Sequence, residues 1–229
     1  RDILDEMGIG VPKTWEDFLS ATSILQRKNM NTYLPYVKIL SSTTVNTGAG
    51  GLTIYPTMLM QNGENLYNGA LSATNLTSPS AVRAFKQWTD FYTLYKLNPD
   101  VNFYQRFRVG TIPLGIASYT QYLVFSAAAS EIAGKWEIAR LPGVRREDGT
   151  VNAICSGSGT GCVIMNSSRH KDAAWKFLKW WTDADAQVNY GTDLESILGA
   201  AARYASANIK AVERTPWPVS EYKNIMKQW

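Results

Sequence analysis

Apolar residues recur every three or four positions in several stretches of the chain, a spacing that is typical of amphipathic helices. The clearest begins at Ser78-Pro79, where the serine is the expected N-cap and the proline fills the first turn. The apolar stripe that follows is expected to face the core rather than a ligand. It comprises Val82, Phe85, Trp88 or Thr89, Tyr92 and Tyr95.

A second helix start lies near the beginning of the chain. Thr14 is expected to cap this helix, because its hydroxyl can accept a hydrogen bond from the first free backbone N–H groups. Glu16 and Asp17 place negative charge at the positive end of the helix. Phe18 is expected to be the first residue on the apolar face of this helix.

Short apolar runs bounded by turn residues indicate β-strands between the helices. Strands are expected over residues 33–40, 112–117, 136–141 and 153–165. Helices are expected over residues 52–61, 119–132 and 169–181, with a short one from 182 to about 191. Strands that alternate with helices favour an α/β fold.

Composition excludes some classes of protein. The net charge of +4 comes from scattered Lys and Arg residues, whereas nucleic-acid-binding proteins usually carry a basic stripe. No run of eighteen apolar residues is present, so no membrane-spanning helix is expected. The chain begins at Arg1 without a signal peptide, so we expect a fragment or a processed form. Twelve Tyr and eight Trp fit contact with carbohydrate, and equally fit a large core.

Residues suited to catalysis or metal binding are sparse. His170 is the single histidine, so serine–histidine and cysteine–histidine arrangements lack a partner. Cys155 and Cys162 lack metal-ligand spacing, and free buried thiols are favoured over a disulfide between them. The glycine-rich residues 157–161 precede an expected strand rather than a helix, which excludes a P-loop. We expect no catalytic residue, metal or cofactor.

A polar, aromatic segment follows the expected strand at residues 112–117. Tyr119, Gln121 and Tyr122 come directly after it, at the edge of the sheet where open α/β folds bind ligands. A tyrosine ring offers a flat apolar face and a hydroxyl, which suits a ligand with both C–H faces and hydroxyl groups. This pattern favours a sugar-binding site, although Tyr122 is equally consistent with packing inside its helix.

Four stretches in order along the chain resemble one family. They are Val11-Pro12-Lys13-Thr14-Trp15-Glu16-Asp17-Phe18, the strand region 107–118, the helix 167–181 with Thr182-Asp183, and Leu198-Gly199-Ala200-Ala201-Ala202-Arg203. Together they are similar to motifs of the extracellular solute-binding proteins of ABC importers, in the branch that carries sugars. The resemblance covers most of the chain.

The resemblance implies a periplasmic-binding-protein-like α/β fold with two lobes and the ligand held between them. Residues 1–152 and 206–229 would form lobe two, and residues 153–205 the returning segment of lobe one. The amino-terminal part of lobe one would have no counterpart in this sequence.

The resemblance also implies a function and partners. The protein would bind a carbohydrate, an oligosaccharide in our expectation, and deliver it to the membrane subunits of a permease. It would be a monomer at the cell surface as a lipoprotein, or in the periplasm. Peptide and polyol binders share this architecture. Two other classes stay open: an α/β carbohydrate-active enzyme and a non-catalytic protein-interaction domain.

Eight residues are candidates for ligand contact, and each has a structural alternative. Tyr55 sits where the resemblance places a cleft aromatic, but it can equally be a core residue beside Pro56. Arg203 can clamp hydroxyl groups or pair with a carboxylate such as Glu195. The full set is Tyr55, Gln61, Tyr119, Gln121, Tyr122, Ser158, Arg203 and Trp217.

Overall fold

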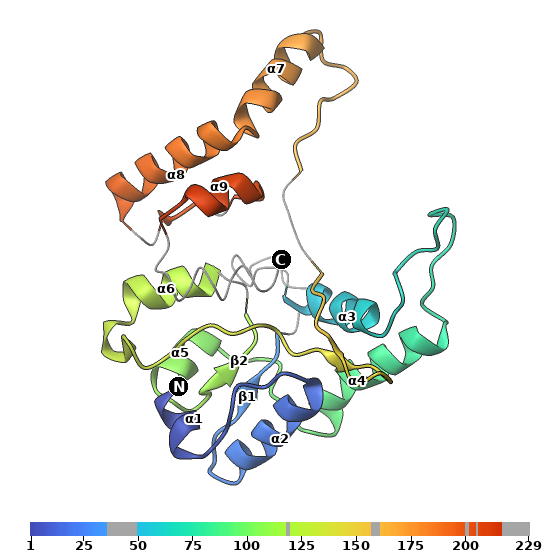
Figure 1. Cartoon of the computed structure of the whole chain (residues 1–229), viewed down its shortest axis with the longest axis vertical. Coiled ribbons are helices and arrows are strands. Elements are labelled where there is room, and N and C mark those ends of the chain that lie inside the picture. The colour runs from blue at the N-terminus through green and yellow to red at the C-terminus, as the bar shows by residue number, and fades with distance from the viewer. Residues whose placement is uncertain (36–49, 118–119, 157–160, 200–201, 205, 217–229) are drawn as a thin grey trace. The chain divides into compact units, whose positions relative to one another are not determined.

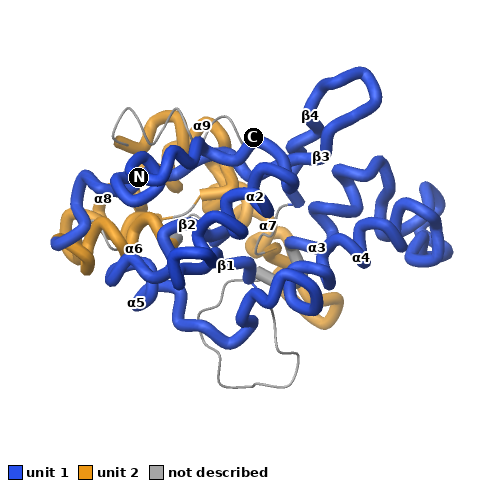
Figure 2. Tube along the Cα trace, turned by 90° about the horizontal axis from the view of Figure 1, so that it is seen from below, with its two compact units in different colours: residues 1–118, 131–157, 220–229 blue, residues 119–130, 158–219 orange. Residues whose placement is uncertain are grey.

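The computed structural model describes residues 1–35, 50–117, 120–156, 161–199, 202–204 and 206–216. It divides into two compact units (Figure 2). Unit 1 comprises Arg1–Ser118, Glu131–Gly157 and Ser220–Trp229, and unit 2 comprises Tyr119–Ser130 and Ser158–Val219. These limits differ from those expected for the two lobes, since residues 119–130 fall in unit 2. The assignment of units to lobes stays a prediction.

Unit 1 contains most of the helices and all the described strands (Figure 1). Its helices are α1 (Asp2–Glu6), α2 (Trp15–Gln26), α3 (Gly50–Gln61), α4 (Pro79–Thr93) and α5 (Phe103–Arg108). Its strands are β1 (Thr32–Tyr33), β2 (Leu114–Gly115), β3 (Val144–Arg145) and β4 (Val151–Asn152). β1 pairs in parallel with β2, with Thr32 opposite Leu114, and β3 pairs antiparallel with β4.

The expected start of α2 is confirmed by a complete capping box. The Thr14 hydroxyl accepts a hydrogen bond from the Asp17 N–H at 3.2 Å, and the Asp17 carboxylate accepts one from the Thr14 N–H at 3.0 Å. Hydrogen bonds from the backbone N–H groups of Lys13 and Thr14 hold the pKa of Asp17 below its usual range. The Trp15 N–H donates to the Gly143 carbonyl at 3.2 Å, which ties this helix start to a distant loop.

The core of unit 1 is centred on three aromatic rings from α2 and α4. Trp15, Phe18 and Phe91 meet edge-to-face with centroids 5.7 to 6.1 Å apart, and all three are buried. Such pairs each add about 0.5–1.5 kcal/mol beyond the burial of their area. The buried side chains that surround them include Leu34, Ile54, Met58, Leu59, Ala81, Ala84 and Leu97.

The helix α4 forms as expected, with Ser78 as its cap, but part of its expected core stripe is wrong. Ala81, Ala84 and Phe91 are buried, whereas Val82 and Phe85 are exposed. The two alanines form the buried face of α4, where their small side chains let the backbone lie close to its neighbours. Val82 and Phe85 lie one position further round the helix, about 100° away, and so face outward.

Strands were predicted less well than helices. Of the strand expected over 112–117, only β2 forms. Of the strand expected over 33–40, only Tyr33 lies in β1, and the other described residues of that range are irregular. Residues 136–141 are irregular, as are 153–156 and 161–165 among the described residues. Apolar runs mark residues that can pair in a sheet, but pairing needs a partner strand that the run itself does not specify.

Unit 2 is built from α6 (Thr120–Ala128), α7 (Lys171–Trp181), α8 (Ala184–Leu198) and α9 (Ile209–Arg214). Asp183 caps α8, which continues beyond its expected end near Gly191 to Leu198. The rings of Trp181, Tyr190 and Tyr204 meet at centroid distances of 5.0 to 6.1 Å. The Asn208 side chain caps α9 and donates to the Thr182 carbonyl at 2.9 Å, which joins α9 to the α7–α8 turn.

Both cysteines are free, as expected. The expectation that they are buried is wrong, because Cys155 and Cys162 are exposed. The segments that carry them are irregular, so the strand that was expected to bury the thiols does not form among the described residues.

The close approach of Gly143 to the β3–β4 hairpin generates a stability prediction. A Cβ atom at this position would lie 2.5 Å from the Asn152 carbonyl oxygen, a backbone atom that cannot rotate away. We expect Gly143→Ala to lower the free energy of unfolding by about 1–3 kcal/mol, measured by urea denaturation. Gly69→Ala is the matched control, because a Cβ there meets nothing within 4 Å. Equal stability of the two variants would contradict the prediction.

Candidate ligand-binding site

Tyr55 belongs to an aromatic cluster at the edge of unit 1. It lies on α3 and contacts two rings of α4, Phe85 at 5.9 Å and Trp88 at 6.0 Å between centroids. The ring of Tyr92 extends the cluster, at 6.3 Å from Trp88. Tyr55 is half-buried, and burial raises the pKa of its hydroxyl. Part of this ring is therefore committed to packing, and the rest remains accessible.

Gln61, at the last turn of α3, is committed to hydrogen bonds within unit 1. Its amide oxygen accepts from Trp15 Nε1 at 2.7 Å, and its amide nitrogen donates to the carbonyls of Pro142 and Ile154, each at 3.0 Å. The side chain is only 3 % exposed. These bonds join the start of α2, the end of α3 and the loop around the β3–β4 hairpin. Because these bonds occupy the Gln61 amide, the surroundings of this side chain do not support a contact with a ligand, which stays a prediction.

Thr57, one turn before Gln61, anchors the residue that leads into the glycine-rich stretch. Its buried hydroxyl lies 2.7 Å from the Ser156 hydroxyl and accepts a hydrogen bond from the Ser156 N–H at 3.0 Å. Ser158 follows two residues later, outside the described residues. Thr57 is not among the residues predicted from the sequence, although Thr53, Thr57 and Gln61 recur every four residues and predict a polar stripe along an otherwise apolar helix, which needs polar partners when buried.

Unit 2 brings Arg203 and Glu195 together. Arg203 makes a bidentate ion pair with Glu195, with Nε at 2.9 Å from Oε2 and Nη2 at 2.5 Å from Oε1. These hydrogen bonds lower the pKa of Glu195 and raise that of Arg203. The pairing of Arg203 with Glu195, one of its two expected roles, is confirmed.

Tyr122 and Gln121 are neighbours on α6 with different environments. Tyr122 is buried, as its packing alternative anticipated, and Gln121 is half-buried. Tyr119, Ser158 and Trp217 lie outside the described residues. The described candidates therefore form two groups, Tyr55 with Gln61 in unit 1, and Gln121, Tyr122 and Arg203 in unit 2.

The described part of the chain holds no cluster of three or more His, Cys, Asp or Glu side chains able to bind a metal ion. Within the same residues, none of the helices combines the length and apolar character that crossing a bilayer requires.

A family model described as bacterial extracellular solute-binding protein matches residues 1–188. An ABC transporter solute-binding protein from Thermotoga lettingae, solved with α-D-tagatose, has a TM-score of 0.65 at 17 % identity and is matched over 100 % of this chain and 56 % of its own. The sugar-binding protein MalE from Xanthomonas citri gives 0.65 at 19 % identity, over 99 % and 54 %.

A third similar structure is the cyclic α-maltosyl-1,6-maltose-binding protein from Arthrobacter globiformis, with a TM-score of 0.60 at 20 % identity, over 98 % of this chain and 56 % of its own. At these identities the similarity shows the fold alone. The expected periplasmic-binding-protein-like α/β fold is thereby confirmed. The chain spans about half the length of the structures that it matches.

The Arg203–Glu195 pair generates a prediction of pH dependence. Because the pKa of Glu195 is lowered on folding, the pair stabilises unit 2 above the ordinary glutamate pKa of 4.5, and this contribution is lost as the pH falls below it. We expect the free energy of unfolding to fall more steeply from pH 5 to 3 in the wild type than in Glu195→Gln, by about 1 kcal/mol.

Urea denaturation across this pH range, followed by circular dichroism, measures the difference. Glu213→Gln is the control, because it removes the same charge from an exposed position on α9. If Glu195→Gln keeps the same pH dependence as Glu213→Gln, the pair does not stabilise unit 2.

Proposed function

Since the chain belongs to the bacterial extracellular solute-binding protein family, we propose that it is the solute-binding component of an ABC importer specific for a carbohydrate. In this proposal the protein binds an oligosaccharide outside the cell membrane and delivers it to the permease. The observation that carries the proposal is the family match over residues 1–188, four-fifths of the chain.

The ligands of the similar structures support a sugar rather than another solute. Those proteins were solved with, or are described as binding, tagatose, maltose, cycloalternan and cyclic α-maltosyl-1,6-maltose. Most of these are oligosaccharides. Their fold is the fold of this chain, and fold alone does not fix the ligand.

The proposed mechanism is closure of two bodies around the ligand without covalent chemistry. The chain passes between units 1 and 2 at four points, after residues 118, 130, 157 and 219. The proposed contacts with the ligand are an aromatic face from Tyr55 and polar or aromatic contacts from Tyr119, Gln121 and Arg203.

Each proposed contact follows from the chemistry of a sugar. The C–H face of a pyranose ring stacks on an aromatic ring, and its hydroxyl groups take part in hydrogen bonds to amides and guanidinium groups. Arg203 is suited to this role because Glu195 fixes the plane of its guanidinium before the ligand arrives. Fixing a side chain in advance lowers the entropy lost on binding.

The enzymatic alternative has no observation in its favour. A glycosidase needs a carboxylic acid whose pKa is raised so that it can protonate the leaving group. Every described carboxyl group with a resolved shift has a lowered pKa: Asp17, Glu64, Glu131, Asp148 and Glu195. Hydrogen bonds and arginines keep these carboxyl groups ionised, whereas the general acid of a glycosidase must stay protonated.

We expect the 229-residue chain alone to bind sugars weakly or not at all, because it spans about half of the structures whose ligands suggest the function. Titration calorimetry with maltose and longer maltooligosaccharides measures this directly. Micromolar affinity of the isolated chain would show that the missing length is not needed for the site.

Where this sequence is part of a longer protein, we expect that protein to gain thermal stability from its ligand. At a free ligand concentration of about 100 Kd the stabilisation is about 2.7 kcal/mol, which raises Tm by several degrees. A panel of mono- and oligosaccharides would be screened by differential scanning fluorimetry. Tyr119→Ala should abolish the ligand-induced shift, and Tyr67→Ala, which removes an exposed ring of a unit 1 loop, should retain it. No shift with any sugar would redirect the proposal to peptides or to a protein-interaction domain.

A further inference from the structure

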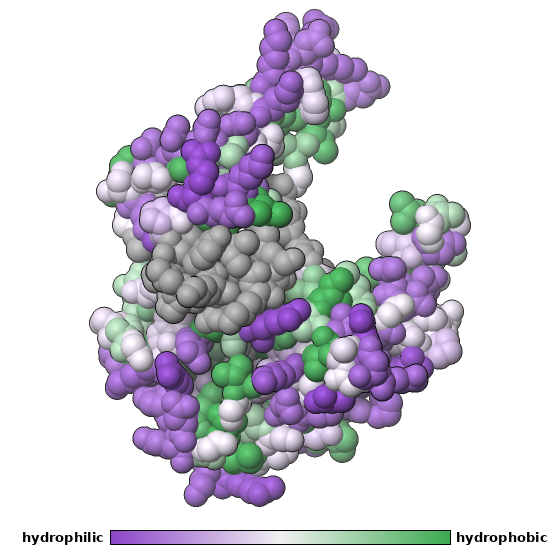
Figure 3. All heavy atoms as spheres, viewed as in Figure 1, coloured by the Kyte–Doolittle hydropathy of each residue, from purple (hydrophilic) through white to green (hydrophobic). Residues whose placement is uncertain are grey.

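The loop between α3 and α4 contains the dipeptide Asn-Gly twice, in two different environments. Asn62-Gly63 directly follows α3, and Asn68-Gly69 lies in the loop that Figure 1 shows leading away from both helices. Figure 3 shows hydrophilic and hydrophobic side chains of this loop at the surface of unit 1. An asparagine that precedes glycine is prone to lose its side-chain nitrogen, because glycine has no Cβ atom to hinder attack by its backbone nitrogen. The local structure decides which of the two asparagines reacts.

Asn68 holds the end of this loop through both its side chain and its backbone. Its Oδ1 accepts from the N–H groups of Ser72 and Ala73 at 2.9 and 3.4 Å, and its Nδ2 donates to Ser72 Oγ at 3.0 Å. The Asn68 N–H donates to the Ala73 carbonyl at 3.0 Å, and the Asn68 carbonyl accepts from the Leu71 N–H at 2.9 Å. Leu71 has a φ of 55°, a left-handed conformation that is unfavourable for leucine. Such a conformation persists only where the surrounding bonds hold it.

Gly69 presents an accessible backbone nitrogen next to the Asn68 amide. Residues 69–74 are exposed, and a Cβ atom at Gly69 would meet nothing within 4 Å. Within the described part of the chain, the Gly69 N–H donates to no backbone carbonyl. The bonds that hold the Asn68 amide all lie in this exposed turn. A local opening that leaves the core of unit 1 intact therefore frees the amide to rotate toward the Gly69 nitrogen.

The amide of Asn62 and the nitrogen of Gly63 are both held by the end of α3. The Gly63 N–H donates to the Met60 carbonyl at 3.0 Å, and Asn62 Nδ2 donates to the Met58 carbonyl at 2.8 Å. Met58 and Leu59 are fully buried in the core of unit 1. Releasing Asn62 and Gly63 thus requires the last turn of α3 to unfold, which costs more than opening an exposed turn.

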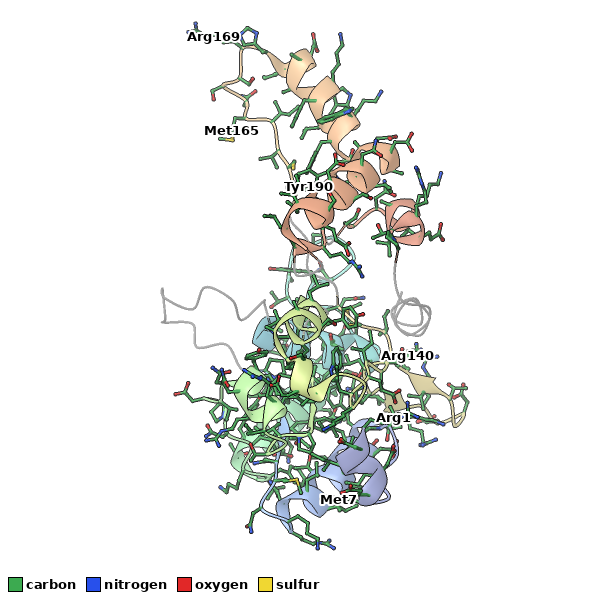
Figure 4. All side chains as sticks on the ribbon, turned by 90° about the vertical axis from the view of Figure 1, so that its left-hand side faces the viewer. Arg1, Met7, Arg140, Met165, Arg169 and Tyr190 are labelled. Atoms are coloured by element: carbon green, nitrogen blue, oxygen red, sulfur yellow. The ribbon has the colours of Figure 1, made fainter. Side chains whose placement is uncertain are left out.

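Asn166 separates the effect of exposure from the effect of the following glycine. It lies in the loop that leads into α7, between Met165 and Arg169, which Figure 4 labels. Asn166 and Ser167 are both exposed. The nitrogen that would attack the Asn166 amide belongs to Ser167, whose Cβ atom hinders the approach. Exposure alone would make Asn166 reactive, whereas exposure combined with a following glycine is found at Asn68.

We propose that Asn68 is a site of spontaneous covalent modification that opens the loop between α3 and α4 as the protein ages. The Gly69 nitrogen forms a bond to Asn68 Cγ, and the bond between Cγ and Nδ2 breaks. The side-chain nitrogen leaves as ammonia with the proton that Gly69 loses, and a succinimide ring remains. Water then opens the ring at either of its carbonyl groups, which gives aspartate or isoaspartate at this position. The inference does not depend on which ligand the protein binds.

Both products weaken the turn, and isoaspartate weakens it more. Aspartate keeps oxygen atoms that accept hydrogen bonds but has no N–H group to donate to Ser72 Oγ. Isoaspartate adds a carbon atom to the backbone before Gly69, so the side-chain and backbone bonds to Ser72 and Ala73 cannot all form together. Leu71 is then no longer held in its left-handed conformation. An exposed loop that loses its internal bonds becomes a preferred site of proteolysis.

Incubation of the 229-residue chain at neutral pH and moderately raised temperature tests the site. Tandem mass spectrometry follows the conversion of each amide to an acid and distinguishes isoaspartate from aspartate by backbone fragments. In the folded chain we expect Asn68 to react several-fold faster than Asn62 and Asn166. In guanidinium chloride, Asn62 and Asn68 should react at similar rates, because both precede glycine. If Asn68 reacts no faster than Asn62 or Asn166 in the folded chain, the proposal is wrong.

Gly69→Ala tests both the attacking nitrogen and the consequence for the loop. The variant should keep the urea midpoint of the wild type, because its Cβ has space, yet Asn68 should react several-fold more slowly. Gly10→Ala is the matched control, since its Cβ also meets nothing within 4 Å and no asparagine precedes it.

Limited proteolysis then measures the opening of the loop. After incubation, the wild type and Gly10→Ala should be cut between residues 66 and 75 several-fold faster than before, whereas cutting of Gly69→Ala should stay the same. An unchanged rate at Asn68 in Gly69→Ala would overturn the proposed attack by the Gly69 nitrogen. Conversion of Asn68 in the wild type without faster cutting would overturn the proposed opening of the loop.

Discussion

The hydrogen bond between the Trp15 indole and the Gln61 amide is the contact on which unit 1 depends. Burying Trp15 supplies the largest side chain of the core, but it also removes the indole N–H from water, so that an acceptor is required. Gln61 supplies this acceptor, and its own amide N–H groups donate to two carbonyls far along the chain, those of Pro142 and Ile154. One amide group thus holds three segments together around the aromatic rings. Local helix propensity alone would not bring these segments together.

Features governed by neighbours in sequence could be predicted, and features governed by distant partners could not. Thr14 and Ser78 cap their helices as expected, because a cap needs only the next three residues. The expected stripe of α4 is wrong at Val82 and Phe85, since the face that turns inward is chosen by what packs against it. The strand expected to begin at residue 153 fails for the same reason, because sheet pairing is a long-range interaction.

The same distinction between neighbouring and distant partners applies to the candidate site. Pairing of Arg203 with Glu195 is local, eight residues apart on and after α8, and could be anticipated from the sequence. The structural role of Gln61 joins residues 46, 81 and 93 positions away, and nothing near Gln61 in the sequence indicates it. The sequence likewise indicates that α7 has an apolar face, but only the structure shows that the described chain does not cover it.

The balance of charge around Arg203 bears on which solutes the protein would reject. Glu195 neutralises the guanidinium through a bidentate pair that is largely shielded from water. In the proposed site, a neutral polyhydroxylated molecule would accept hydrogen bonds from the guanidinium without disturbing that balance. A uronic acid or another anionic sugar would gain little net attraction and would meet the Glu195 carboxylate as a like charge. In the proposed site, an arginine that in isolation suggests anion binding would therefore, through its partner, favour uncharged solutes.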